Sequence, residues 1–369
     1  IFMKILKFLC SIVFSLILIA TTLNAADIDY IIDTDIGGDI DDVLALFVAL
    51  DNPVKPLAIT TTHIEPREKA QIAKLVVTYA GFSEIPVYAG IGTTRNDPRE
   101  LFLQQNPLWP PFFGYPDSLP GDSPWFPQQA VPYRQMNHSI FDEMNIEEES
   151  APEYLARIAK NYSPQHKLVI VSLGPLHNIS AALKINPSIS SNLKIYSMGG
   201  IYPKGYNWLV SPEVTAPVLG TTEVISIVSQ FVDAHDFYIT PEEFLEIEKS
   251  AQSEFGLAVI QDWKNWYNID KRNLNKTHLS DPVTLYLALH PEEITHMSSK
   301  LLTFPCLDLN GVLAPEFAGS WYNMPGLENK LMKVEDSEES HIKFVSQVES
   351  SSAIRRKIIN SIKQILGNS

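Results

Sequence analysis

The chain has 369 residues, of which 45% are hydrophobic, and its 28 Lys and Arg residues against 43 Asp and Glu residues give a formal net charge of −15. This length is sufficient to bury a sizeable core in one large domain or two smaller ones. The acidic balance, with no run of basic residues, argues against nucleic acid or an anionic membrane surface as a partner.

The N-terminal residues have the pattern of a secretory signal peptide. Residues 3–7 carry two lysines, residues 8–20 form an apolar run, and small and polar residues follow up to Ala26. The alternative is a single membrane anchor, but the uncharged run is short for a membrane span. We therefore expect residues 1–26 to be removed and residues 27–369 to form one exported domain, periplasmic or secreted. That domain would keep only Cys306, so it would have no internal disulfide.

An acidic loop follows the apolar, strand-like residues 28–32 and precedes the apolar, helix-like residues 43–50. Within ten residues it contains five aspartates: Asp33, Asp35, Asp39, Asp41 and Asp42. A loop of solvated carboxylates with one aspartate as helix N-cap accounts for one or two of these residues, not for five. A bound cation removes the repulsion among them, and carboxylate oxygens are the ligands that Ca²⁺ and Mg²⁺ prefer. In open α/β sheets such sites lie at the carboxyl ends of the strands, so the loop predicts a metal site there.

Strand-like and amphipathic helix-like segments alternate along the rest of the chain. The expected strands are residues 56–62, 85–89, 167–172, 193–198, 224–232 and 300–309, and the expected helices include residues 67–80, 152–162, 176–184 and 353–366. This alternation predicts an α/β fold with a mostly parallel central sheet flanked by helices.

Residues 96–135 interrupt this alternation. They are rich in Pro, Phe and Trp and carry few helix or strand signals. Long insertions of this kind in a compact domain tend to be functional, and the aromatic content argues against disorder. Two interpretations remain open: a packing flap or oligomer contact, and a loop that covers a substrate.

Two common acidic motifs do not explain the loop. An EF-hand needs a glutamate at its twelfth position, which is Leu44 when counted from Asp33. Phosphatases of the haloacid dehalogenase type also begin with Asp-x-Asp after a strand, but their motif does not continue with a residue such as Gly37 and does not explain the later aspartate pair.

The order Asp33-Thr34-Asp35-x-Gly37, followed by Asp41-Asp42 and an apolar helix, resembles the signature of the inosine-uridine-preferring nucleoside hydrolases. The spacing before the aspartate pair is longer than in the commonest form and is similar to that of bacterial relatives. Three further segments resemble landmarks of the family: residues 173–179, 198–213 and 280–282.

The resemblance implies a metal centre and a catalytic base. The expected ion is Ca²⁺, with Asp35, Asp42, Asp281 and the backbone carbonyl of Leu173 as ligands, and Asp41 is the expected general base. Asp281 followed by a proline also fits a simple helix N-cap, and the two roles are compatible.

The resemblance also assigns other residues to the same site. Asn207 matches an asparagine that binds ribose hydroxyls, and His63 and Asp39 are expected on the substrate side. A substitute or auxiliary metal ligand is the alternative role for Asp39. Asp33 is expected to contact the metal ligands without binding the ion itself.

The sequence departs from the family pattern at three positions. His63 stands where the family has an asparagine, Gly205 where it has a glutamate that contacts ribose, and Ser280 where it has a histidine that acts as an acid or orienting group for the leaving base. His278 lies two residues before Ser280 and is not assumed to replace that histidine.

Taken as a member of this family, the chain is expected to have the Rossmann-like nucleoside hydrolase fold and to hydrolyse the N-glycosidic bond of ribonucleosides, giving ribose and a free base. A nucleoside is the expected partner, with no nucleic acid, no membrane after signal cleavage, and assembly into a homodimer or homotetramer. The alternatives are a periplasmic nucleoside- or ribose-binding protein on a weakened scaffold and a metal-dependent phosphatase.

Overall fold

The computed structural model describes residues 28–37, 39–63, 66–92, 144–200, 205–269, 276–314, 317 and 329–368. The expected signal peptide, residues 1–26, and the aromatic insertion, residues 96–135, lie outside the described residues, so both stay predictions. No helix of the described part is long and apolar enough to cross a lipid bilayer.

A nine-stranded sheet forms the centre of the molecule, in the order β10-β9-β11-β6-β5-β4-β1-β2-β3, and β7 pairs separately with β8. The strands that run parallel to one another are β1 (Tyr30–Thr34), β2 (Ala58–Thr61), β3 (Val87–Ala89), β4 (Leu168–Ser172), β5 (Leu193–Met198), β6 (Glu223–Ile227) and β11 (Ile342–Val348). The others are β9 (Ile294–Thr303) and β10 (Lys333–Asp336), which make antiparallel pairs at one edge, and the short β7 (Tyr238–Ile239) and β8 (Thr277–His278). The prediction of a mostly parallel sheet is confirmed.

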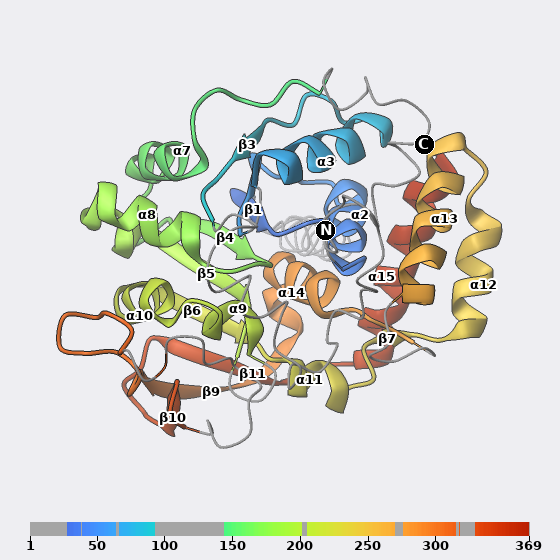
Figure 1. Ribbon diagram of the computed structural model, residues 1–369. Helices are drawn as coiled ribbons and strands as arrows, with labels where there is room; N and C mark the ends of the chain where they lie inside the picture. The colour runs from blue at the N-terminus through green and yellow to red at the C-terminus, as the bar shows by residue number, and fades with distance from the viewer. Residues whose placement is uncertain are drawn as a thin grey trace, which may run out of the picture.

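Helices cover both faces of this sheet (Figure 1). One face carries α7 (Ala151–Ile158), α8 (His177–Ile185) and α10 (Pro212–Thr221), and the other carries α2 (Asp41–Asp51), α3 (Pro66–Tyr79), α14 (Ser280–Leu289) and α15 (Ser351–Asn368). Outside α15 lie α12 (Pro241–Ser250) and α13 (Glu254–Ile269). The short elements are α9 (Tyr206–Leu209), α11 (Ser229–Ala234) and the 3-10 turns η1 (Ala159–Asn161), η2 (Pro187–Asn192) and η3 (Pro291–Glu293).

The core sits where β1 and β4 pass between the two helical layers. All five residues of each strand are buried, and each strand is apolar until it ends in polar residues, Asp33 and Thr34 in β1 and Ser172 in β4. The helices α2 and α14 pack against each other and are buried almost all round. A helix that is apolar on every side needs such a central place.

The sequence predicted two regions wrongly. The strand expected at residues 224–232 ends at Ile227, and the chain continues as α11, whose Phe231 and Val232 are buried as helical residues. The strand expected at 300–309 is β9, which lies earlier, and β10 and β11 were not predicted. The edge strand β10 is mostly exposed and charged, so it lacks the apolar signal on which strand prediction depends.

Candidate active site

The site begins where β1 ends. The hydroxyl of Thr34 donates a hydrogen bond to the Asp42 carboxylate and accepts one from the Ile36 amide at 3.1 Å, which ties the end of the strand to the start of α2. Gly37 has a φ of 106°, a backbone conformation that glycine adopts without the clash of a side chain. This turn brings Asp41 and Asp42 into the first turn of α2, where the helix dipole favours negative charge.

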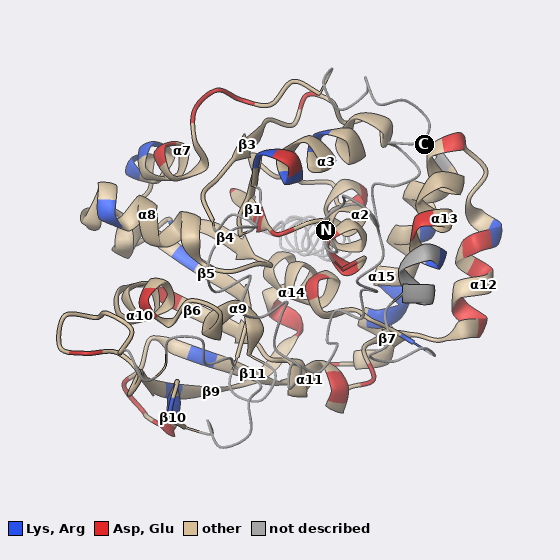
Figure 2. Ribbon diagram, in the orientation of Figure 1, with Lys and Arg blue, Asp and Glu red and all other residues tan. Residues whose placement is uncertain are grey.

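Three carboxylates converge at this point from two helices. Asp41, Asp42 and Asp281 each offer one oxygen, and these oxygens lie within 4.8 Å of one another. Figure 2 shows the acidic residues where α2 and α14 begin. Burial raises the pKa of Asp42 and Asp281 well above the ordinary value for aspartate, and neighbouring carboxylates, Asp35 for Asp42 and Asp41 for Asp281, add to the shift. Oxygen donors that are buried together and repel one another fit a divalent cation.

Asp35 reaches the same place from the loop after β1. A Cβ atom added to Gly174, the residue after Leu173, would lie 2.9 Å from the Cγ and Oδ1 atoms of Asp35, so only glycine allows this approach. Burial raises the pKa of Asp35 to about 6, and the charge of Lys69 opposes that rise. The structure therefore brings together all the carboxylates that the family resemblance assigns to the metal and to the base. The tightest group contains Asp41, the expected base, rather than Asp35, an expected ligand.

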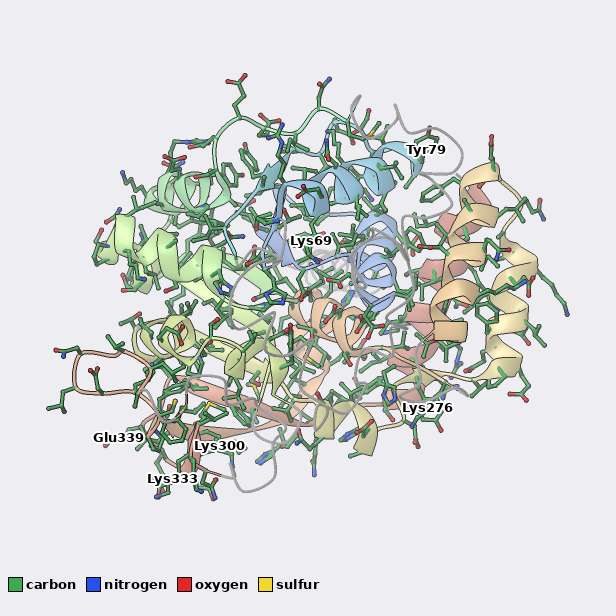
Figure 3. The ribbon with its side chains drawn as sticks, in the orientation of Figure 1. Lys69, Tyr79, Lys276, Lys300, Lys333 and Glu339 are labelled. Atoms are coloured by element: carbon green, nitrogen blue, oxygen red, sulfur yellow. The ribbon has the colours of Figure 1, made fainter. Side chains whose placement is uncertain are left out.

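Lys69, labelled in Figure 3, is a cation of this site that the sequence analysis did not identify. Its ammonium donates hydrogen bonds to the backbone carbonyl of Asp35 and, at 2.9 Å, to that of Ile36, and the residue is only 3% exposed. Its charge acts to lower the pKa of Asp35 and Asp42. The sequence did contain a signal for this buried lysine. Lys69 lies on the same face of the helix as Ile72 and Ala73, which are apolar and buried.

Asp33 points to the other face of the sheet. Its Oδ1 accepts hydrogen bonds of 2.7 Å from the Thr60 hydroxyl and from the Asn178 amide. Asn178 also donates to the carbonyl of Thr61 at 2.9 Å and accepts from the amide of Ile91 at 2.9 Å. Burial raises the pKa of Asp33 to about 7. This network holds the ends of β1 and β2 in place against α8.

Asn207 lies between the ends of β4 and β5. Its Nδ2 donates to the carbonyl of Leu173 at 2.5 Å and to the carbonyl of Met198 at 3.0 Å. The next residue, Trp208, is buried and donates from Nε1 to the Ser197 hydroxyl at 2.9 Å, which fixes α9 on β5. A carbonyl oxygen has two lone pairs, so Leu173 can accept this bond and still serve as a ligand.

Two histidines and a tyrosine lie beside these strand ends. His63 is buried, with its Nε2 2.7 Å from the Tyr206 hydroxyl and its ring stacked on His177 at a centroid distance of 6.2 Å. Burial lowers the pKa of His63 well below the ordinary value for histidine, and the charges of His177 and Lys69 act in the same direction. His63 is therefore a neutral imidazole near neutral pH.

Three sequence candidates remain: Ser280 in α14, His278 in β8 and Asp39 in the acidic loop. Ser280 is the first residue of α14, half-buried, and its carbonyl accepts a hydrogen bond of 2.9 Å from the Thr284 hydroxyl. His278 is in β8, and its Nδ1 lies 3.3 Å from an oxygen of Asp233 in α11. Asp39 lies in the acidic loop and accepts from the amide of Ile40 at 2.9 Å.

Comparison with known proteins decides the family. The family described as inosine-uridine preferring nucleoside hydrolase matches residues 30–342, a span that includes the acidic loop and the three other landmark segments. The chain belongs to this family. As a nucleoside hydrolase it is an enzyme that acts on N-glycosyl bonds, and the family resemblance inferred from the sequence is confirmed.

Relatives of this nucleoside hydrolase agree in sequence and in fold. A probable uridine nucleosidase 2 of Arabidopsis thaliana is 27% identical over 323 residues, which cover 84% of this chain and 88% of the plant protein. The structure of an inosine-guanosine nucleoside hydrolase superimposes with a TM-score of 0.64 at 15% identity, covering 91% of this chain and 99% of that one. A purine-preferring ribonucleoside hydrolase from Gardnerella vaginalis gives a TM-score of 0.61 at 18% identity, covering 92% and 100%. These structures show that the fold is shared.

Proposed function

We propose that this nucleoside hydrolase is a Ca²⁺-dependent enzyme that cleaves the N-glycosidic bond of ribonucleosides, giving ribose and a free base. One observation supports the proposal most directly: Asp41, Asp42 and Asp281 converge from α2 and α14 at the same sheet edge as Asn207. The plant relative described above is named a probable uridine nucleosidase, which agrees with a ribonucleoside substrate.

The proposed residues for the ion are Asp35, Asp42, Asp281 and the carbonyl of Leu173. The donor set fits, because all four groups offer oxygen and the buried carboxylates repel one another without a cation. When bound, a divalent cation lowers the pKa of a coordinated water and anchors hydroxyl groups of the sugar.

The protein's own groups supply the remaining chemistry. In the proposal, Asp41 takes the proton of the attacking water as general base. The sugar passes through an oxocarbenium-like transition state, and the negative carboxylates around it stabilise the positive charge that develops there. Asn207 is proposed to bind ribose hydroxyls through its Oδ1, because its Nδ2 is engaged with the two strand ends. His63 and Asp39 are proposed on the substrate side.

The test is a panel of ribonucleosides, including inosine and uridine, followed by ribose release in Ca²⁺ buffer, after removal of the ion by a chelator, and after Ca²⁺ is restored. We expect turnover that disappears with the chelator and returns with Ca²⁺. Tight nucleoside binding without turnover would instead support the binding-protein alternative, and release of phosphate from a nucleotide would support a phosphatase.

The proposal also includes export and assembly. Export rests on the signal-like residues 3–26 alone, because the curated relatives compared are plant proteins and do not bear on a bacterial, periplasmic or secreted location. N-terminal sequencing of the mature protein should begin near Ala26 or Asp27, and a product that retains residues 3–20 would overturn it. A homodimer or homotetramer is expected by family resemblance, and light scattering of the purified protein would measure it.

A further inference from the structure

The backbone carbonyl of Leu173 is the neutral member of the proposed ligand set. A carboxylate carries a full charge and can rotate toward a cation, whereas a carbonyl has only a partial charge and points where its peptide points. Its value as a ligand therefore depends on how firmly the surrounding groups hold that peptide. Which groups do so is a question that rests on the proposed function, because it matters only if the carbonyl binds the ion.

The peptide that carries this carbonyl lies against the acidic loop. The Leu173 amide donates a hydrogen bond to the carbonyl of Asp33 at 2.7 Å, which continues the pairing of β4 with β1. A Cβ atom added to Gly174, the next residue, would lie 2.9 Å from Cγ of Asp35, so the peptide is in contact with that carboxylate. The Ser172 hydroxyl donates to the carbonyl of Gly174 at 3.1 Å. The turn is therefore ordered by contacts within the chain, beside a proposed ligand of the ion.

Asn207 holds the oxygen of this peptide from the opposite side, in α9. Its Nδ2 lies 2.5 Å from the carbonyl oxygen of Leu173 and 3.0 Å from that of Met198. Both partners are carbonyl oxygens, which only accept hydrogen bonds, so the amide must present its NH₂ group to them. Its two N–H bonds thus join the ends of β4 and β5, and the partners determine which way the amide faces.

The helix that carries Asn207 is anchored by a separate contact. Trp208 is fully buried and donates from Nε1 to the Ser197 hydroxyl at 2.9 Å. A Cβ atom added to Gly199 would lie 2.0 Å from that Nε1, so the indole ring packs directly on the backbone at the end of β5. Because α9 is fixed in this way, the amide that holds the Leu173 carbonyl is ordered before any ligand binds, and binding does not have to order it.

We propose that Asn207 is a positioning residue for the ion: its amide holds the Leu173 carbonyl in the direction that the ion requires, in addition to the ribose contact proposed above. The two roles differ in where their loss is measured. Loss of a ribose contact changes nucleoside binding and leaves the affinity for the ion unchanged. Loss of a residue that orients a ligand lowers ion affinity by roughly 10- to 100-fold, even when no nucleoside is present.

The test is calorimetric titration of the ion-free enzyme with Ca²⁺ in the absence of nucleoside. Asn207→Leu keeps a similar side-chain volume and removes the donor, and we expect its Kd for Ca²⁺ to rise roughly 10- to 100-fold. The matched control is Ser197→Ala, which removes the partner of Trp208 and loosens α9 without removing the donor to Leu173. It should lower the midpoint of denaturant unfolding, because a buried N–H is left unsatisfied, while Kd changes by less than about threefold.

Unchanged Ca²⁺ affinity in Asn207→Leu, with only the KM for inosine raised, would overturn the proposal and leave Asn207 as a ribose contact. An equal rise of Kd in Ser197→Ala would also overturn it, because the effect would then come from the loosened helix. If Asn207→Leu does not fold, Asn207→Ser decides, since serine leaves space for water at the two carbonyls and is too short to join them. A wild-type enzyme that binds no Ca²⁺ or cleaves no nucleoside would instead refute the proposed function, and this inference with it.

Discussion

The buried carboxylates at the two ends of α14 have opposite electrostatic surroundings. Beyond its C-terminal end, Glu293 accepts hydrogen bonds from the ammonium of Lys357 at 2.5 Å and from the hydroxyl of Tyr286 at 2.7 Å. Although burial alone raises the pKa of Glu293, these two donors bring it below its ordinary value. At the N-terminal end, Asp281 faces Asp41 and Asp42, and both burial and its neighbours raise its pKa.

The difference separates a structural carboxylate from a binding carboxylate. A buried charge that the protein itself pairs contributes to the fold and has no further need of a ligand. A buried cluster of like charges costs stability until something of opposite charge binds, so its stabilisation depends on that ligand. In the proposed enzyme the same helix therefore serves the fold at one end and ion binding at the other, and variants at each end should change different measured quantities.

The largest effect is expected from Asp42→Ala, which removes a carboxylate from the cluster at the N-terminal end of α14, where the carboxylates face one another. Loss of a residue that only hydrogen-bonds to a metal ligand lowers affinity by roughly 10- to 100-fold. Because Asp42 is a proposed ligand itself, we expect Ca²⁺ affinity to fall by more than this, and turnover to fall with it. Calorimetric titration with Ca²⁺ and a ribose-release assay measure the two. Asp51→Ala, at the exposed far end of the same helix, is the control and should change neither. Unchanged Ca²⁺ affinity in Asp42→Ala would show that the cluster is not the metal site.

The next variants test which carboxylate is the general base and which is a metal ligand. Asp41→Asn should keep Ca²⁺ affinity while kcat falls about 10²- to 10⁴-fold, because an amide retains the shape but cannot take a proton. Asp35→Asn should show the reverse pattern: it should lower Ca²⁺ affinity, and turnover should fall because the ion is lost. Because Asp41 belongs to the tightest group of carboxylates, loss of Ca²⁺ in Asp41→Asn would make it a ligand, and the base would then be sought at Asp39.

The smallest effect is expected beyond the C-terminal end of α14, where Lys357 pairs with Glu293. Glu293→Gln should lower the free energy of unfolding by about 1–2 kcal/mol, since it weakens charge-assisted hydrogen bonds while Lys357 stays half-exposed and hydrated. Denaturant unfolding measures this, and Ca²⁺ affinity and kcat should stay at wild-type values. Glu292→Gln, the exposed neighbour, should change none of these quantities. A clear loss of Ca²⁺ affinity in Glu293→Gln would mean that the two ends are coupled and that the distinction fails.

The sequence predicted those parts of the molecule that depend on residues close together in the chain. The alternation of apolar segments was enough to predict the parallel sheet, and five aspartates in ten residues were enough to predict an acidic cluster at this place, which the structure contains. Asp281 lies far along the chain from the acidic loop, so it was identified only through the resemblance to the family.

Contacts between distant segments were not predictable in the same way. The pairing of His63 with Tyr206 depends on how the loop after β2 meets α9, and no spacing along the chain encodes that meeting. In the sequence Lys69 is an ordinary helical lysine, and only the fold shows that the loop after β1 places the carbonyls of Asp35 and Ile36 beside it. The edge strand β10 is specified by pairing with β9 rather than by an apolar pattern of its own.

Lys69 has a consequence for the order in which the enzyme is assembled. Its ammonium supplies part of the countercharge for Asp35 and Asp42 from within the chain, and it fixes the carbonyls of the loop that carries them. The chain can therefore bring these carboxylates together before the proposed ion binds, because Lys69 already offsets part of their repulsion. In the proposed enzyme, folding of the polypeptide and activation by the ion are therefore separate events.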